Sequence, residues 1–318
     1  MSIVRRSAGL RWVLFAIVGI SAGTLFVVIN TGFGSSADNE PLVSEDQANY
    51  AVFATSLPEE LSFAAEEVPL QFFDVRESLD RELISNTYFH SQTIRYIKLS
   101  SRYFPVIEPI LDSFDIPNDF KYLAIAESGL ENVVSPAGAT GFWQIAKGTG
   151  LDYGLEINNE VDERYHLEKS TEAACDYLRE SYEKYGNWTM AAASYNAGRR
   201  GMDRQITRQK EQSYYDLLLN DETARYLYRV LAFKLILEDP SAYGFKLSNR
   251  DLYQEIPYKL VEVTGGVPDF ADFAKEHDTN YKMLKRLNPW LRDNKLTNSK
   301  GHTYQIKIPV DRQLDGEL

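Results

Sequence analysis

Glu127 is the residue of this sequence best placed for acid–base chemistry. It lies near the end of the segment from Pro117 to Ser128, which starts with a residue suited to the first turn of a helix and is followed by Gly129, suited to a left-handed cap. Helical spacing places on one face Phe120, Leu123, Ala124 and Glu127. A carboxyl group on an apolar face without a cationic partner has a raised pKa, which suits a general acid. The alternative interpretation of Glu127 is a solvated glutamate at a helix end without a catalytic role.

Two later segments combine glycine with side chains that form hydrogen bonds. Gly138-Ala-Thr-Gly141-Phe-Trp-Gln144-Ile145 allows close approach of a ligand to the backbone, and the Gln144 amide offers a donor and an acceptor. Ser194-Tyr195-Asn196-Ala-Gly198 places a hydroxyl and an amide at a predicted helix end. Each segment taken alone is equally well a tight turn or a helix stop.

Taken together, these segments resemble the four motifs of the soluble lytic transglycosylase domain. In order and spacing, the matching residues are Ala126-Glu127-Ser128-Gly129, Gly138-x-x-Gly141-Phe-Trp-Gln144-Ile145, Ala193-Ser-Tyr195-Asn196-Ala-Gly198 and Glu222-Thr223-x-x-Tyr226. The resemblance extends to the membrane-bound lytic murein transglycosylase D group through Asp162-Glu-Arg164-Tyr165, Ser170-Thr171-Glu172-Ala173-Ala174 and Val75-Arg76-Glu-x-x-x-Arg81-Glu82. Ser194, where Ala is commoner, and Leu130, where an aromatic is often found, depart from the pattern. A lysozyme-like α-helical fold is implied.

The resemblance also implies a reaction with one carboxyl group. Glu127 would protonate the oxygen between N-acetylmuramic acid and N-acetylglucosamine, and would then take the proton of the C6 hydroxyl that attacks C1. The product would be a 1,6-anhydro end, formed without water. Tyr226 would orient Glu127, and the residues expected to hold the peptidoglycan strand are Ser128, Gln144, Tyr195 and Asn196. A goose-type lysozyme-like hydrolase and a catalytically silent peptidoglycan-binding protein remain the alternatives.

Hydrophobic periodicity predicts a mainly α chain around these motifs. Residues 68–245 are expected to form the catalytic domain with its preceding helices, and residues 31–67 a linker. Helical spacing begins at Val75, Leu79 and Leu83, and further helices are predicted over residues 170–186, 189–197 and 222–237.

The pattern changes after Pro257 to a β-α-α-β unit within residues 256–310. Alternating strands are predicted at Tyr258–Val263 and Tyr304–Ile308, with helices around residues 270–275 and 281–287. The unit resembles a LysM module, which implies binding of glycans that contain N-acetylglucosamine. Thr264-Gly265-Gly266-Val267-Pro268 replaces the usual Gly-Asp-Thr-Leu opening, so glycan binding by this module stays open.

Residues 1–30 are predicted to be a membrane anchor or a signal segment. Trp12 to Ile29 carries no charge, and Arg5, Arg6 and Arg11 precede it. An apolar run of this length suits a helix through the inner membrane with the rest of the chain in the periplasm. A cleaved signal ending near Ser35-Ser36-Ala37 is the alternative.

The amino-acid composition argues against several other classes of protein, beginning with nucleic-acid-binding proteins. A net charge of -12 disfavours nucleic acid as a partner, because such binding requires clustered Lys and Arg. Cys175 is the single cysteine, so the chain has no intramolecular disulfide and no cysteine before it to carry a lipid. The scattered histidines, which do not have metal-ligand spacing, are His90, His166, His277 and His302. No metal or cofactor is therefore expected.

Overall fold

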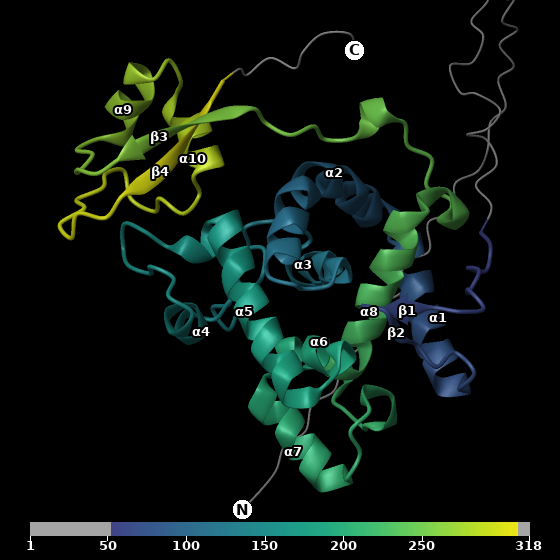
Figure 1. Cartoon of the computed structure of the whole chain (residues 1–318). Coiled ribbons are helices and arrows are strands. Elements are labelled where there is room, and N and C mark those ends of the chain that lie inside the picture. Colours follow the sequence, from purple (N-terminus) through teal and green to yellow (C-terminus); the bar gives the residue numbers. More distant parts are fainter. Residues whose placement is uncertain (1–51, 311–318) are drawn as a thin grey trace, which may run out of the picture. The chain divides into compact units, whose positions relative to one another are not determined.

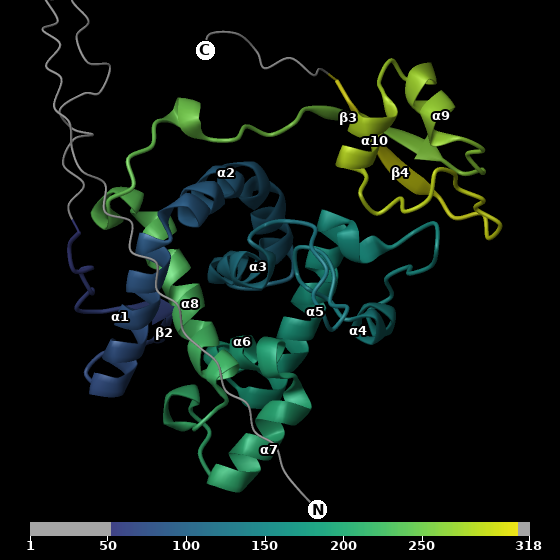
Figure 2. The same cartoon turned by 180° about the vertical axis from the view of Figure 1, so that it is seen from behind.

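The computed structural model describes residues 52–310, shown from two opposite sides in Figures 1 and 2. Helices dominate up to about residue 250, and the last part of the described chain contains the two longest strands. The α-helices are α1 (Phe73–Tyr88), α2 (His90–Ser113), α3 (Lys121–Ser128), α4 (Lys147–Asp152), α5 (Leu167–Tyr185), α6 (Trp188–Ala197), α7 (Arg199–Gln209), α8 (Asp221–Glu238), α9 (Phe270–Glu276) and α10 (Tyr281–Leu287). The strands are β1 (Ser62–Phe63), β2 (Glu66–Glu67), β3 (Tyr258–Val263) and β4 (Tyr304–Pro309). Short 3-10 turns occupy Asn118–Phe120, Glu163–Tyr165, Tyr214–Asp216, Pro240–Tyr243 and Asn249–Asp251.

The mainly α character is confirmed, and α3 lies at the centre of the helical region (Figures 1 and 2). Helices α2 and α8 pack against α3, and α8 also packs against α1. The buried side chains of α3 are Tyr122, Leu123, Ala124 and Ile125, which explains how so short a helix is held. Burial of this apolar face in the main core fixes α3 as a platform for the end that carries Glu127.

Most helices predicted from periodicity are confirmed with ends displaced by a few residues. Helix α5 begins at Leu167 instead of at residue 170, and α8 begins at Asp221, where the Asn220 side chain accepts a bond from Thr223 N. The segment expected to be one helix from Pro117 instead starts with a 3-10 turn before α3. Helices α4 and α7 were not predicted because they bury few side chains, and Met202 is the one buried residue of α7.

The end of the expected linker is wrong, because its last residues are packed into the main core. Phe63 is fully buried, and its ring lies 5.1 Å from that of Phe120. Between β1 and β2, Ala64 and Ala65 have φ values of 53° and 64°, and Asp119 Oδ2 accepts the Ala64 N–H at 2.8 Å. Non-glycine residues rarely adopt this conformation, so long-range contacts stabilise the turn. Local periodicity could not reveal such a segment.

Glu66, also from the expected linker, caps the N-terminus of α6. Its carboxylate accepts bonds from Trp188 N at 2.5 Å, Thr189 N at 2.8 Å and Thr189 Oγ1 at 2.7 Å. A carboxylate is favourable at this end of a helix, because free N–H groups point towards it. Since α6 ends at Tyr195, Asn196 and Ala197, this contact helps to fix two of the predicted site residues.

The predicted β-α-α-β unit is confirmed, with β3 and β4 antiparallel and Tyr258 opposite Pro309. Its core contains Phe270, Leu284, Leu291 and Ile306. Val161 and Tyr165, which lie between α4 and α5, belong to the same core cluster. The unit is therefore completed by two side chains from the helical region, as expected for a domain too small to bury a large core alone.

The predicted membrane segment, Trp12 to Ile29, lies outside the described residues. Within residues 52–310, no helix has both the length and the apolar character needed to cross a membrane.

Candidate active site

Glu127 lies in the last turn of α3, at the end of the face predicted from the sequence. The other members of that face, Phe120, Leu123 and Ala124, are fully buried, whereas Glu127 keeps part of its surface exposed. Gly129 ends the helix with φ 65°, and its N–H donates to Ile125 O at 2.8 Å. A Cβ at this position would stand 2.4 Å from the Tyr96 ring. The carboxyl group is thus fixed at a helix end that solvent reaches.

Tyr226 of α8 is the direct partner of Glu127. Its buried hydroxyl donates to Glu127 Oε1 at 2.6 Å, so the structure brings together the two residues to which the sequence assigned the acid and its support. Burial raises the pKa of Glu127 from 4.5 to about 7, although the Tyr226 hydrogen bond lowers it. A phenol orients a carboxyl group without adding a positive charge, so this acid can hold a proton near neutral pH.

Charged neighbours shift the pKa of Glu127 less than burial and the Tyr226 hydrogen bond do. The carboxylate of Glu222 raises the pKa of Glu127, and the guanidinium of Arg229 lowers it. Arg229 Nε also lies 3.8 Å from Glu82 Oε2, and Arg225 Nε donates to Glu82 Oε1 at 2.7 Å. Two arginines of α8 therefore lie next to the buried Glu82 carboxylate. The hydrogen-bonding partner of Glu127 is Tyr226.

Tyr195 links the glycine-rich segment to α6. Its hydroxyl donates to Trp143 O at 2.7 Å, and the buried Trp143 indole donates to Thr171 Oγ1 at 2.8 Å. Burial, together with the charge of Glu127, raises the pKa of Tyr195 well above its usual value. Tyr195 therefore stays a neutral hydroxyl. It lies close enough to Glu127 for the two groups to interact electrostatically, as expected for residues that line the same site.

Asn196 joins the end of α6 to the start of α8. Its Oδ1 accepts the Thr223 hydroxyl at 2.9 Å, and its Nδ2 lies 3.4 Å from Glu222 Oε1. The motif that contains Glu222 and Tyr226 is therefore held to the Tyr195-Asn196 motif by side-chain hydrogen bonds. These contacts set the spacing of the two helices around the acid.

Ser128 and Gln144 form hydrogen bonds to the backbone of the site. The Ser128 hydroxyl lies 2.8 Å from Phe142 O, and Gln144 Nε2 donates to Gly141 O at 2.8 Å and Val133 O at 3.1 Å. Both side chains thus shape the loop that follows α3. Their assignment to substrate contacts stays a prediction, since the polar atoms named here already have partners within the protein.

Arg164 holds this loop in place, a role that the sequence did not reveal. It forms two bonds to Asp162, at 2.9 and 2.7 Å, and its Nη1 donates to Gly138 O at 3.1 Å and Ile145 O at 3.3 Å. Gly141 has φ 83°, and a Cβ there would stand 2.0 Å from Arg164 O. The motif Asp162-Glu-Arg164-Tyr165 was the available signal, but the sequence does not show that Arg164 reaches backbone oxygens 19 and 26 positions earlier in the chain.

The described part of the chain contains no cluster of side chains suited to bind a metal ion. Among residues 52–310, no three or more His, Cys, Asp and Glu side chains are grouped to hold an ion. His166 and His302 instead lie beside Glu168 and Glu156, each pair at 3.2 Å.

Comparison with known proteins assigns two domains. Residues 113–218 match the family described as Transglycosylase SLT domain, and residues 259–312 match the Soluble lytic transglycosylase C-terminal LysM-like domain. The chain thus contains an SLT-type transglycosylase domain and a LysM-like domain. Tyr226 lies beyond the first match, so its contact with Glu127 comes from the structure.

The chain is similar to proteins named Membrane-bound lytic murein transglycosylase D from two strains of Escherichia coli. Identity to each is 30% over 183 residues, and the alignment covers 56% of this chain and 40% of the relative. The chain thus matches less than half the length of these relatives.

Proposed function

We propose that this protein is a peptidoglycan lytic transglycosylase that cleaves the β-1,4 bond between N-acetylmuramic acid and N-acetylglucosamine. The observation that carries the proposal is the pair of Glu127 and Tyr226, in which a carboxyl group with a pKa of about 7 accepts a bond from a buried phenol. The SLT match and the relatives named as lytic murein transglycosylases support the same reaction.

Glu127 acts first as an acid and then as a base in the proposed reaction. Its proton moves to the bridging oxygen as the bond from that oxygen to C1 breaks, and the substrate N-acetyl group stabilises the positive charge at C1. The C6 hydroxyl then attacks C1 and gives its proton to the Glu127 carboxylate. The products are a free hydroxyl on one fragment and a 1,6-anhydro end on the other, and the acid is regenerated without water.

Tyr226 keeps the carboxyl group oriented through both proton transfers. Tyr195 and Asn196 are proposed to hold the sugar ring, together with Ser128 and Gln144, whose backbone contacts fix the adjoining loop. Most of the rate increase would then come from placement and electrostatics.

The products of digestion in water labelled with oxygen-18 test this proposal. Purified glycan strands should yield 1,6-anhydro ends that contain no label, as measured by mass spectrometry. Labelled reducing ends would identify a hydrolase of goose-lysozyme type, which uses water in the second step. Unchanged strands would identify a binding protein without catalysis.

We further propose residues 68–245, together with the packed segment that contains Phe63 and Glu66, as the catalytic domain. Residues 256–310 are proposed as a LysM-like module, and Trp12 to Ile29 as a span of the inner membrane with the catalytic domain in the periplasm. The relatives named membrane-bound support an envelope location. An apolar span is held by lipid and not by charge, so washing membranes with salt should not release the protein. A mature N-terminus near Asp38 would show instead that the segment is a cleaved signal.

A further inference from the structure

Two adjoining cavities lie where the LysM-like module meets the helical region. The residues that line both are Arg102, Tyr103, Asn132, Phe142 and Arg286. Because these residues are shared, the cavities form one groove with walls from α2, from the loop after α3 and from α10. We call it the seam groove.

One wall of the seam groove is formed by the segment that follows α3, the helix of the proposed active site. Leu130, Glu131 and Asn132 line it and begin only three residues after Glu127. Phe142 lines it as well, and its carbonyl oxygen lies 2.8 Å from the Ser128 hydroxyl. A strand whose scissile bond lies at Glu127 therefore has a branch point within reach of this groove, since five extended residues span at most about 18 Å.

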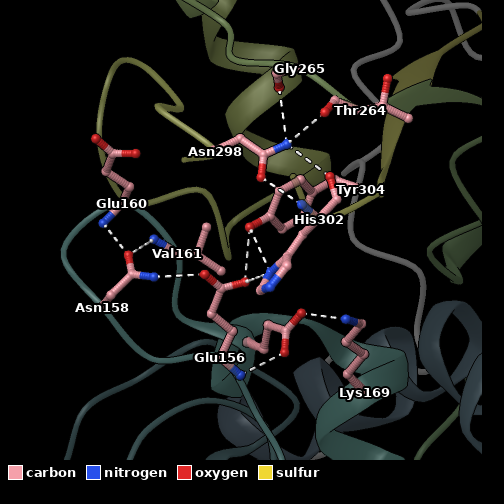
Figure 3. Close-up of polar contacts among 11 residues, drawn as sticks. Glu156, Asn158, Glu160, Val161, Lys169, Thr264, Gly265, Asn298, His302 and Tyr304 are labelled. Atoms are coloured by element: carbon pink, nitrogen blue, oxygen red, sulfur yellow. Dashed lines mark hydrogen bonds and ion pairs between the residues drawn. The ribbon is translucent and has the colours of Figure 1, made fainter. Parts of the chain in front are cut away.

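The opposite wall belongs to the module, which is fixed by contacts with residues 156–162. Figure 3 shows Glu156 directed towards His302 and Tyr304, with the Tyr304 hydroxyl donating to Glu156 Oε2 at 2.9 Å. Main-chain bonds join Asp162 N to Trp290 O at 2.9 Å and Arg292 N to Glu160 O at 2.7 Å. This docking holds α10, and with it Arg286, at the groove.

Arg286 has no ion pair or hydrogen bond to any residue of the 52–310 range, and its side chain is exposed. Arg102 donates from Nε to Gln254 O at 2.8 Å and lies over the Tyr253 ring, and it forms no ion pair with a carboxylate of residues 52–310. Two guanidinium groups thus remain available in a chain whose net charge is -12.

The other charges of the groove are already largely balanced. Arg95 pairs with Glu131, and Lys307 pairs with Glu168. Glu255 is the one lining carboxylate without an ion pair in the described residues. The available excess is therefore positive, and guanidinium groups bind carboxylates in forked, directional pairs.

From this we infer that the seam groove binds the acidic peptide branch of peptidoglycan, with Arg286 and Arg102 holding its carboxylates. The inference rests on the proposed function, since the branch is covalently joined to the sugar chain that Glu127 would cleave. Sugar binding is less suited to this groove, because Phe142 and Trp290 are buried and Lys307 lies over the Tyr258 ring at 4.6 Å. The module thereby acts as a wall of the substrate site and not as a loose tether.

Kinetics of the full-length Arg286→Ala protein test the inference on two substrates. One is glycan strands with their peptides retained, and the other is the same strands after an amidase has removed the peptides. Loss of one exposed charge-assisted contact should raise KM on the first substrate about 10-fold, with kcat nearly unchanged. On the stripped strands KM should change less than about 2-fold. Arg286→Lys should fall between, since an ammonium group pairs with a carboxylate without the fork.

Lys282→Ala provides the matched control, because Lys282 is exposed on the same helix and does not line either cavity. It should leave KM on both substrates at the wild-type value. Equal losses for Arg286→Ala on both substrates, or no loss on either, would overturn the inference.

The outcome remains separable from that of the proposed function. Binding of both strand preparations to the full-length Glu127→Gln protein, followed by sedimentation, requires no catalysis. If the wild-type protein makes no anhydro ends, the proposed function fails, while selective loss of binding to peptide-bearing strands in Arg286→Ala still supports the groove. Equal binding of both preparations, unchanged by Arg286→Ala, contradicts the groove alone.

Discussion

Glu127 in the candidate active site and Glu168 beside the module have crowded surroundings but opposite pKa shifts. Burial raises the pKa of Glu127 to about 7, and its hydrogen-bonding partner is the neutral phenol of Tyr226. Burial alone would raise the pKa of Glu168 as well, but the His166 hydrogen bond and the Lys307 charge lower it to about 2. A neutral partner leaves a carboxyl group able to exchange a proton, whereas a cationic partner such as Lys307 fixes its charge and makes it a structural contact.

Removing the exchangeable proton should have the largest effect. Glu127→Gln keeps the shape of the side chain but can neither donate nor accept the required proton, so the yield of anhydro ends should fall by about 1,000-fold or more. Glu172→Gln, an exposed position on α5, is the matched control and should keep full activity. A Glu127→Gln protein with near-wild-type turnover would remove Glu127 from the mechanism.

Removing the Tyr226 hydroxyl, the neutral partner of Glu127, should lower activity less and should shift its pH dependence. Tyr226→Phe should lower kcat/KM by about 10- to 1,000-fold, because the carboxyl group loses its orienting donor. The wild-type rate should decline as pH rises through about 7, where Glu127 loses its proton. The Tyr226 bond lowers that pKa, so the decline in Tyr226→Phe should move to higher pH. An unchanged profile would contradict this role.

The raised pKa of Glu127 also predicts a stability cost of the active site. The folded protein binds the proton more tightly than the unfolded chain, so this group lowers stability as pH rises from 4.5 to about 7. Glu127→Gln should therefore increase the free energy of unfolding at pH 8 by up to about 3 kcal/mol, and by much less at pH 4. Urea unfolding at both pH values measures the difference, and a variant no more stable at pH 8 than at pH 4 relative to wild type would contradict it.

The contribution of Glu168 to stability should have the opposite pH dependence. Its pKa is lowered in the folded protein, so its contribution is complete above pH 4.5 and is lost as pH falls towards about 2. Glu168→Gln should destabilise the protein at pH 7 by about 1–3 kcal/mol, a range that allows for solvent screening of a partly exposed side chain. Thermal unfolding at pH 7 and at pH 2 checks this, with Glu172→Gln again as the control. A loss of equal size at both pH values would exclude the ion pair as its cause.

The sequence was sufficient for the helix of Glu127 and the β-α-α-β unit, because apolar spacing and glycine caps are local signals. The pairing of Tyr226 with Glu127 was expected from the resemblance, not from periodicity, and the structure shows the contact itself. Glu66, assigned to a linker, caps α6 through contacts more than 120 positions away. Arg164 and Arg286 belong to the same category, since residue type alone does not disclose which distant backbone or cavity a guanidinium reaches. Side-chain partners across the chain therefore required the structure.

The bond between Tyr226 and Glu127 joins residues 99 positions apart in the chain. Contacts of such sequence separation require closure of a long loop, so they form with the late, non-local part of folding. Before α8 docks on α3, Glu127 is an ordinary solvated glutamate, ionised at neutral pH and without a proton to donate. The protonated Glu127 that the proposed reaction requires would thus be present at neutral pH only after the core has closed, and a newly made chain would be inactive until then.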